Sequence, residues 1–194
     1  MTIITTEYKT FDLHNKEVQK VILDKHYDIN VDEGSDWYQY SIDDIKQALV
    51  CLGFYDNEVN FSGFFSQGDG AQFTGRYSYE KGALAKVKKD YPNWTDLHNL
   101  ASDLQELQRS HFYKLTASLE TTGRYSHENC VSFDIYSEQR ELSEDDEESF
   151  KETCKSFMRS IYRMLEEEYE YLTSEEAIKE CFDCNEYEFN NKGE

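Results

Sequence analysis

The stretch 60–79 constrains the fold most, because it carries four glycines and six aromatic residues within twenty positions. Two aromatic runs flank the sequence Gly-Asp-Gly at 68–70. Glycine supplies the positive φ angles that a tight hairpin turn needs. We therefore predict a β-hairpin with strands at 59–66 and 71–79. Gly75 lies inside the second strand, where glycine usually marks a bulge or a close backbone approach.

The rest of the chain mixes further strands with helices. Apolar and polar residues alternate at 115–121 and 130–136, which predicts a second hairpin, and a loose alternation at 5–13 predicts one more strand. Helical spacing of apolar residues predicts helices at about 16–27, 35–52, 81–89, 96–111, 143–172 and from 174 onward. Hairpins mixed with helices indicate an α+β fold, in which an antiparallel sheet built from two β-hairpins packs with about five or six helices. We predict a single domain over 1–189 and a disordered tail over 190–194.

Charge narrows the range of partners. The chain has 40 acidic and 20 basic residues, which gives a formal net charge of −20. Direct binding to nucleic acid or to an anionic membrane requires a positive field, so neither is expected. The segment 138–194 alone holds 19 of the acidic residues and 7 of the basic ones. This distribution favours a protein partner with a basic surface.

Cysteine usage and hydropathy indicate the compartment. The five cysteines are odd in number and irregular in spacing, so no disulfide framework is expected. The first ten residues lack the apolar run of a signal peptide. No stretch reaches the roughly 18 apolar residues that are needed to span a bilayer. We expect a cytoplasmic protein in a reducing environment.

One short segment occurs twice. Residues 74–80 and 122–128 agree at six of seven positions, as TGRYSYE and TGRYSHE. If the two hairpin ends converge, the guanidinium groups of these segments could bind an anion. The residues of this possible ligand site are Gln67, Asp69, Arg76, Arg124 and His127. The alternative is a fortuitous match, or two hairpins that use similar packing.

No catalytic constellation is visible. The chain lacks the GxSxG and HExxH patterns, and the Cys-x-x-Cys sequence at 181–184 has no second pair. Carboxylates are too numerous for any one pair to indicate acid–base chemistry. We expect no catalytic residues, no metal and no cofactor, and we expect that the protein is not an enzyme.

The acidic helices are the remaining feature. Their carboxylates lie largely off the apolar stripe, and one interpretation is an ordinary solvated face. The other is an acidic partner-binding surface whose carboxylates are arrayed like the phosphates of nucleic acid. The residues of that surface are Glu144, Asp145, Asp146, Glu147, Glu148, Glu152, Glu166, Glu167 and Glu170, with Glu168 beside them.

The stretches 61–84, 104–130 and 156–178 resemble an uncharacterised family of small acidic proteins from phages and prophages, whose tag is FSGF[FW]SQGDGAxF. The resemblance covers roughly residues 35–189. Some members carry the label "antitoxin of a toxin–antitoxin system", and members often have tryptophan where this chain has Phe65. The resemblance brings no catalytic residues with it, and it implies a phage setting in a bacterial host cell.

These observations lead to one expected function and two alternatives. We expect a phage-encoded acidic protein that inhibits a host defence or toxin protein by direct contact, with its carboxylates mimicking nucleic-acid charge. The first alternative is the antitoxin of a toxin–antitoxin pair. The second is a small-ligand-binding protein or enzyme with its site at the paired TGRYS segments. A homodimer is a further possibility, because the chain has more aromatic residues than one small core needs.

Overall fold

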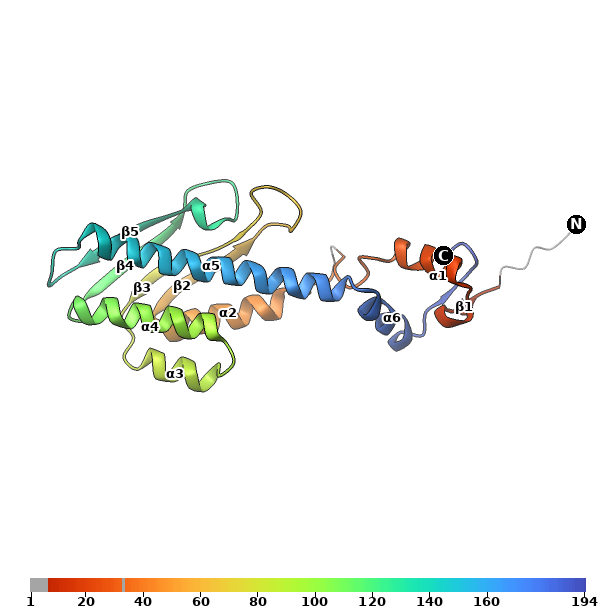
Figure 1. The fold of residues 1–194 in the computed structure, drawn as a ribbon, viewed down its shortest axis with the longest axis horizontal. Helices are drawn as coiled ribbons and strands as arrows, with labels where there is room; N and C mark the ends of the chain where they lie inside the picture. Colours follow the sequence, from red (N-terminus) through yellow and green to blue (C-terminus); the bar gives the residue numbers. More distant parts are fainter. Residues whose placement is uncertain (1–6, 33) are drawn as a thin grey trace, which may run out of the picture. The chain divides into compact units, whose positions relative to one another are not determined.

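A computed structural model describes residues 7–32 and 34–194 of the chain. Its internal contacts divide the chain into two compact units, and each is described by itself. Unit 1 combines residues up to Tyr38 with Glu166–Glu194, and unit 2 is Gln39–Leu165. The α+β class is confirmed, with six α-helices, a four-stranded antiparallel sheet and a two-stranded sheet in the described residues (Figure 1). That the whole chain folds as one domain stays a prediction.

The four-stranded sheet of unit 2 consists of the two predicted hairpins. Its antiparallel order is β2-β3-β4-β5. The strands are β2 (Phe54–Phe61), β3 (Ala71–Ser78), β4 (Leu115–Thr121) and β5 (Val131–Ser137). Because side chains alternate across a strand, Phe54, Phe73 and Leu119 lie on one face and are fully buried. The opposite face is mostly polar and largely exposed, although Gln72 is buried there and Tyr136 is an exposed aromatic residue.

Helices cover the apolar face. Figure 1 shows α2, α4 and α5 lying against the same side of the sheet, while α3 flanks α2 and α4. Their bounds are α2 (Gln39–Leu52), α3 (Ala83–Asp90), α4 (Thr95–Ser110) and α5 (Glu144–Leu172), the last of which continues into unit 1. Aromatic rings of the sheet pack against rings of α5. The ring centroids of Phe73 and Phe157 are 6.2 Å apart, and those of Tyr77 and Phe150 are 5.4 Å apart. This layer is the core of unit 2.

The first hairpin differs from its prediction at both ends of its first strand. β2 ends at Phe61 rather than at residue 66, so the connection to β3 is the loop 62–70 and not a tight Gly-Asp-Gly turn. The sequence predicts a turn at 56–57 and a strand from 59, whereas β2 begins at Phe54 and contains a bulge. The pairing register shifts between Tyr55 and Glu58, and Asp56 adopts a left-handed φ of 50°. Gly75 stands opposite the bulge with a φ of 139°, and a Cβ there would lie 2.8 Å from the carbonyl oxygen of Tyr55. The close backbone approach expected at Gly75 is thus confirmed, whereas the bulge itself lies in β2.

Unit 1 has a small core of its own. It contains η1 (Phe11–Leu13), α1 (Lys16–Lys25) and α6 (Glu175–Cys184), with β1 (Lys9–Thr10) paired to β6 (Glu188–Phe189). The side chains of Asn15 and Ser174 cap α1 and α6 by accepting backbone hydrogen bonds, as helix-start residues do. The rings of Phe182 and Phe189 lie 4.8 Å apart in this core.

Within unit 1, a described segment near the N-terminus pairs with one near the C-terminus. The predicted strand at 5–13 shortens to β1 followed by η1, and its first two residues lie outside the described part. The β1–β6 pairing was not predicted, because each strand has only two residues. For residues 190–194 the sequence predicts a disordered tail. In the structure they form a turn in which the Asn190 side-chain oxygen accepts hydrogen bonds from the amides of Lys192 and Glu194.

Gln108 completes the sheet where β3 ends. The side chain is fully buried, its Nε2 donates to the carbonyl oxygen of Leu115 at 2.7 Å, and its Oε1 accepts from the Leu115 amide at 3.2 Å. Because Ser78 is the last residue of β3 and pairs with Thr116, no strand reaches Leu115 from that side. A helical side chain therefore takes the place of a strand.

We expect Gln108→Leu to lower the free energy of unfolding by about 2–4 kcal/mol, because two buried backbone groups lose their partners. Urea denaturation followed by circular dichroism measures this change. Gln105→Leu, one turn earlier on α4 and only half-buried, is the matched control and should change stability by less than about 0.5 kcal/mol. Equal effects of the two substitutions would contradict this role for Gln108.

Candidate functional site

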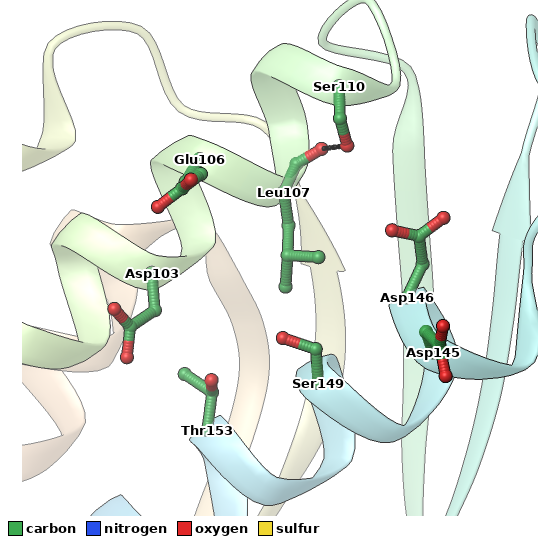
Figure 2. Close-up of a pocket in the computed structure, with 8 residues that line it drawn as sticks. All are labelled: Asp103, Glu106, Leu107, Ser110, Asp145, Asp146, Ser149 and Thr153. Carbon is green, nitrogen blue, oxygen red and sulfur yellow. Dashed lines mark hydrogen bonds between the residues drawn. The ribbon is translucent and has the colours of Figure 1, made fainter.

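An acidic groove lies between α4 and α5. It has a volume of about 560 Å³, with a wall from each helix (Figure 2). In the part of the chain that the structure describes, no lysine, arginine or histidine lines it. The lining residues are Asp103, Glu106, Leu107 and Ser110 from α4, and Asp145, Asp146, Ser149 and Thr153 from α5. Four carboxylates and three hydroxyls thus surround one hollow, whose apolar contribution comes from Leu107.

Helical spacing explains both walls. Asp103 and Glu106 are three residues apart on α4, so their side chains share the face that flanks the buried stripe. The stripe itself consists of Leu97, Leu100, Ala101, Leu104 and Leu107. On α5, the first turn carries Glu144, Asp145, Asp146 and Glu147, a place where the helix dipole favours negative charge.

The pKa of Asp103 reflects the acidity of the groove. Partial burial raises the pKa of this carboxyl, and the charge of Glu106 raises it further. Both causes penalise the ionised form. An incoming cation would relieve this penalty, so the α4 wall favours a positive group.

Asp146 lines the groove and also contacts the buried side chain of His111. The Ser143 hydroxyl donates to Oδ2 of Asp146 at 2.6 Å and accepts from the Asp146 amide at 3.1 Å, which caps the start of α5. Arg140 lies 3.5 Å from the same oxygen. The hydrogen bond from Ser143 lowers the pKa of Asp146 most, and Arg140 and His111 lower it further against the opposing effect of burial.

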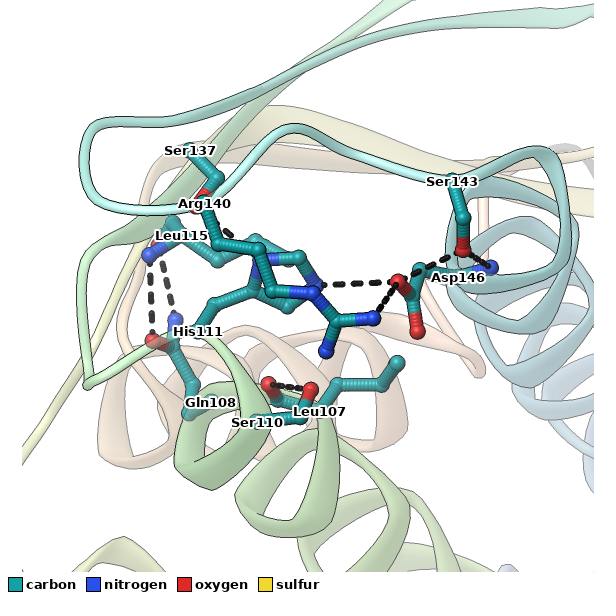
Figure 3. Close-up of polar contacts among 9 residues, drawn as sticks. All are labelled: Leu107, Gln108, Ser110, His111, Leu115, Ser137, Arg140, Ser143 and Asp146. Carbon is teal, nitrogen blue, oxygen red and sulfur yellow. Dashed lines mark hydrogen bonds and ion pairs between the residues drawn. The ribbon is translucent and has the colours of Figure 1, made fainter.

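His111 lies behind this carboxylate and is fully buried (Figure 3). Its Nδ1 is 3.0 Å from the Ser137 hydroxyl, and its Nε2 is 3.4 Å from Oδ2 of Asp146. The second contact lacks hydrogen-bond geometry and is an ion pair when His111 is protonated. Through these contacts, His111 connects the end of α4 with the end of β5 and the start of α5. The contacts therefore hold the wall of the groove in place.

The predicted acidic surface is distributed over both units. In unit 2, Glu147 forms an ion pair with Lys151, and Glu152 forms one with Arg159. Among the described residues, Glu144, Asp145 and Glu148 have no basic partner. The rest of the predicted surface, namely Glu166, Glu167 and Glu170, belongs to unit 1. The unpaired carboxylates at the start of α5 and the groove beside them form the most acidic part of unit 2.

The five residues of the predicted ligand site lie in different surroundings. Arg76 is on β3, on the exposed face of the sheet, and forms an ion pair with Asp56 that raises its pKa. A shallow hollow of about 360 Å³ beside Arg76 includes neither Arg124 nor His127. Arg124 is exposed in the loop after β4. The two TGRYS segments thus occupy a strand and a loop.

The remaining residues of that set belong to the two hairpin loops. The Asp69 carboxylate accepts hydrogen bonds from the amides of Phe65 and Ser66, so it shapes its own loop. Gln67 is exposed in the same loop. His127 contacts Gly70 so closely that a Cβ at Gly70 would lie 2.8 Å from the imidazole ring. The structure thus brings His127 to the first hairpin loop.

The described residues contain no arrangement of three or more His, Cys, Asp or Glu side chains that could hold a metal ion. Cys154 is fully buried, and burial raises the pKa of its thiol, which disfavours the reactive thiolate. Across residues 7–32 and 34–194, no helix combines the length and the apolar character that crossing a bilayer demands.

Sequence reasoning identified only one wall of the groove. Asp145 and Asp146 were predicted as parts of an acidic surface, whereas Asp103 and Glu106 were not. The spacing of these two acids on one flank of α4 was visible, but the sequence does not show that α5 packs beside that flank. No local pattern singles out His111, because Ser137 and Asp146 are remote from it in sequence.

We expect Asp146→Asn to lower the free energy of unfolding by about 1–3 kcal/mol at pH 7, because the substitution removes the charge that Ser143, Arg140 and His111 stabilise. The folded pKa of Asp146 lies below its ordinary value of about 3.9, so this contribution is complete above that pH and is lost as the pH falls through the folded pKa. Denaturation at pH 7 and at pH 3 measures both effects. Asp145→Asn is the control and should change little, and an equal loss in both variants would contradict this role for Asp146.

Comparison with known proteins gives one match. No curated protein and no solved structure matches the chain. A family profile described as "Domain of unknown function (DUF8835)" matches residues 37–175, which include all of unit 2 and most of the chain. The chain therefore belongs to the DUF8835 family, a domain family of unknown function.

Proposed function

We propose that this chain is a phage-encoded acidic binding protein that inhibits a host defence or toxin protein by direct contact in the bacterial cytoplasm. The observation that carries the proposal is the groove between α4 and α5, which has carboxylates on both walls and, among the residues that the structure describes, no basic side chain in its lining. The net charge of −20 supports it, because a field of that size steers a basic partner toward the surface.

The groove suits a lysine or arginine side chain of the partner. Such a side chain carries an apolar stem and a cationic head. The stem can contact Leu107, while the head reaches the carboxylates of Asp103 and Glu106 on one wall and of Asp145 on the other. The hydroxyls of Ser149 and Thr153 can accept further hydrogen bonds from the head.

The exposed carboxylates beside the groove extend the binding surface. Glu144 and Glu148 lie four residues apart on α5, so they share one face of the helix. With Asp145 they form a row of negative charge that stands in for phosphates on a nucleic-acid-binding partner. Nucleic acid itself is repelled by the same charge, so the partner is a protein.

A toxin is the partner in the alternative form of this proposal. The phage and prophage proteins that the sequence resembles include some labelled as antitoxins. A toxin gene directly beside the gene for this chain would favour that form. The other alternative, a ligand site at the TGRYS segments, gains no support from the hollow beside Arg76, which excludes Arg124 and His127.

The test compares two charge-matched variants of the full chain in pull-downs from host lysate. Asp103→Asn with Glu106→Gln removes two charges from the groove, and Asp90→Asn with Glu120→Gln removes two exposed charges elsewhere in unit 2. We expect a partner that is retained at about 50 mM salt and released at about 500 mM, because screening weakens the attraction. The groove variant should retain about tenfold less of it, and the control should retain as much as the unmodified chain. Salt-indifferent capture, or equal losses in both variants, would contradict the proposal.

A further inference from the structure

The outer edge of β5 is unpaired. At the two ends of the β4–β5 hairpin, the Thr122 amide donates to the carbonyl of Cys130 at 2.8 Å, and the Glu138 amide donates to the carbonyl of Lys114 at 3.3 Å. Hydrogen bonding alternates along an antiparallel strand, so the even-numbered residues of β5 bond to β4. In the described part of the chain, no hydrogen bond reaches the outward backbone groups of Val131, Phe133, Ile135 and Ser137.

The other edge of the sheet is protected, whereas β5 is not. On β2, the bulge at Asp56 interrupts the edge, and the Asn57 side chain donates to the carbonyl oxygen of Phe54 at 3.0 Å. β5 has no register shift, no proline and no lysine, and its one charged residue is Asp134. Natural sheets usually block a free edge with a bulge, a proline or an inward-pointing charge, because an unblocked edge pairs with another strand. Asp134 is exposed on the face away from the helices, so it leaves the apolar side of this edge without a charge.

The side chains of β5 also leave apolar surface uncovered. Val131 is buried on the helix side, but Phe133 and Ile135 on the same side are only half-buried, because the sheet ends at this strand. On the other face, Tyr136 is 62 % exposed. A further strand beside β5 would extend the apolar row and satisfy the free backbone groups at once.

We propose that the strand beside β5 is the β5 of a second copy of this chain. Pairing is antiparallel about a two-fold axis at Phe133, so each Val131 faces Ile135 of the second copy and the two Phe133 rings face each other. On the opposite face, Ser132 lies across from Asp134 of the second copy. An axis at Asp134 would place two carboxylates opposite each other, which is unfavourable, and an axis at Ile135 would place Phe133 opposite Ser137.

Charge at the strand ends complements this pairing. Antiparallel strands bring the start of one β5 to the end of the other. Arg124 lies in the loop before β5, is exposed, and has no ion pair within the described residues. Glu141 follows β5 and is likewise exposed. The two-fold axis brings each Arg124 toward Glu141 of the second copy, so the contact occurs twice.

The dimer responds to salt in the opposite way to the proposed inhibitory complex. Each copy carries a net charge of −20, so the copies repel each other at low salt. Screening reduces this repulsion more than it weakens the two Arg124–Glu141 contacts, because exposed ion pairs contribute little, and the apolar and backbone contacts at β5 are insensitive to salt. Association therefore strengthens as salt rises from about 50 to about 300 mM, whereas a complex with a basic partner weakens. The dimer does not depend on the proposed function, and either can fail alone.

Sedimentation equilibrium of the full chain over a concentration series tests the dimer. We expect a monomer–dimer equilibrium that shifts toward dimer with added salt. Ile135→Lys should raise the dissociation constant by at least about tenfold, because it places a charge in the apolar row. Asn60→Lys, on the exposed face of the edge strand β2, is the control and should leave the dissociation constant unchanged. A chain that stays monomeric up to about 200 µM would overturn the proposal.

Two further measurements keep the test independent of folding defects at Ile135. Arg124→Glu alters only an exposed residue and should weaken the dimer, and adding Glu141→Arg should restore it. The position of the two-fold axis is tested by cross-linking. Phe133→Cys should form an interchain disulfide, because hydrogen-bonded antiparallel pairs have Cα atoms about 5.5 Å apart. Asp134→Cys should form much less of the interchain disulfide. More efficient cross-linking through residue 134, or no rescue by the charge swap, would overturn the proposed pairing.

Discussion

The one-sided burial of the four-stranded sheet is the constraint on which unit 2 depends. Alternation along each strand places Phe54, Phe73 and Leu119 on one face, and that face must be covered to remove its apolar surface from water. Three helices cover it, and a groove forms where α4 and α5 run side by side. The sheet is open rather than closed, so it also has two edges. The groove and the free edge of β5 therefore both result from an open sheet that is covered by helices on one face.

The start of α5 links the core to the surface. Asp146 is held by Ser143 and Arg140 and lies against the buried ring of His111, so one carboxylate of the acidic first turn is structural. Asp145, the residue directly before Asp146, lines the groove and has no basic partner among the described residues (Figure 2). Fixing one carboxylate thus orients the neighbour that is free to bind. Negative charge at this helix start is favoured by the dipole, so the acidity costs the fold little there.

Elements with strong local signals were predicted well. Both hairpins and the close backbone approach at Gly75 follow from residue types whose backbone preferences are local. The bulge on the opposite strand was interpreted as a turn, because Asp56 and Asn57 favour turns when strand pairing is not known. The β1–β6 pairing was missed because a strand of two residues has no periodicity to recognise.

By itself, the sequence determined the α+β class, the acidity and the acidic wall on α5, because alternation, helical spacing and charge can be read from neighbouring positions. Only the tertiary structure decided which acids face each other. Asp103 and Asp145 line one groove, and Ser137 and Asp146 meet at His111, through contacts between residues far apart in the chain. The free edge was likewise decided by strand order, since it exists only because β5 is last in the sheet. Local preferences specify elements, whereas the burial of apolar faces determines which elements become neighbours.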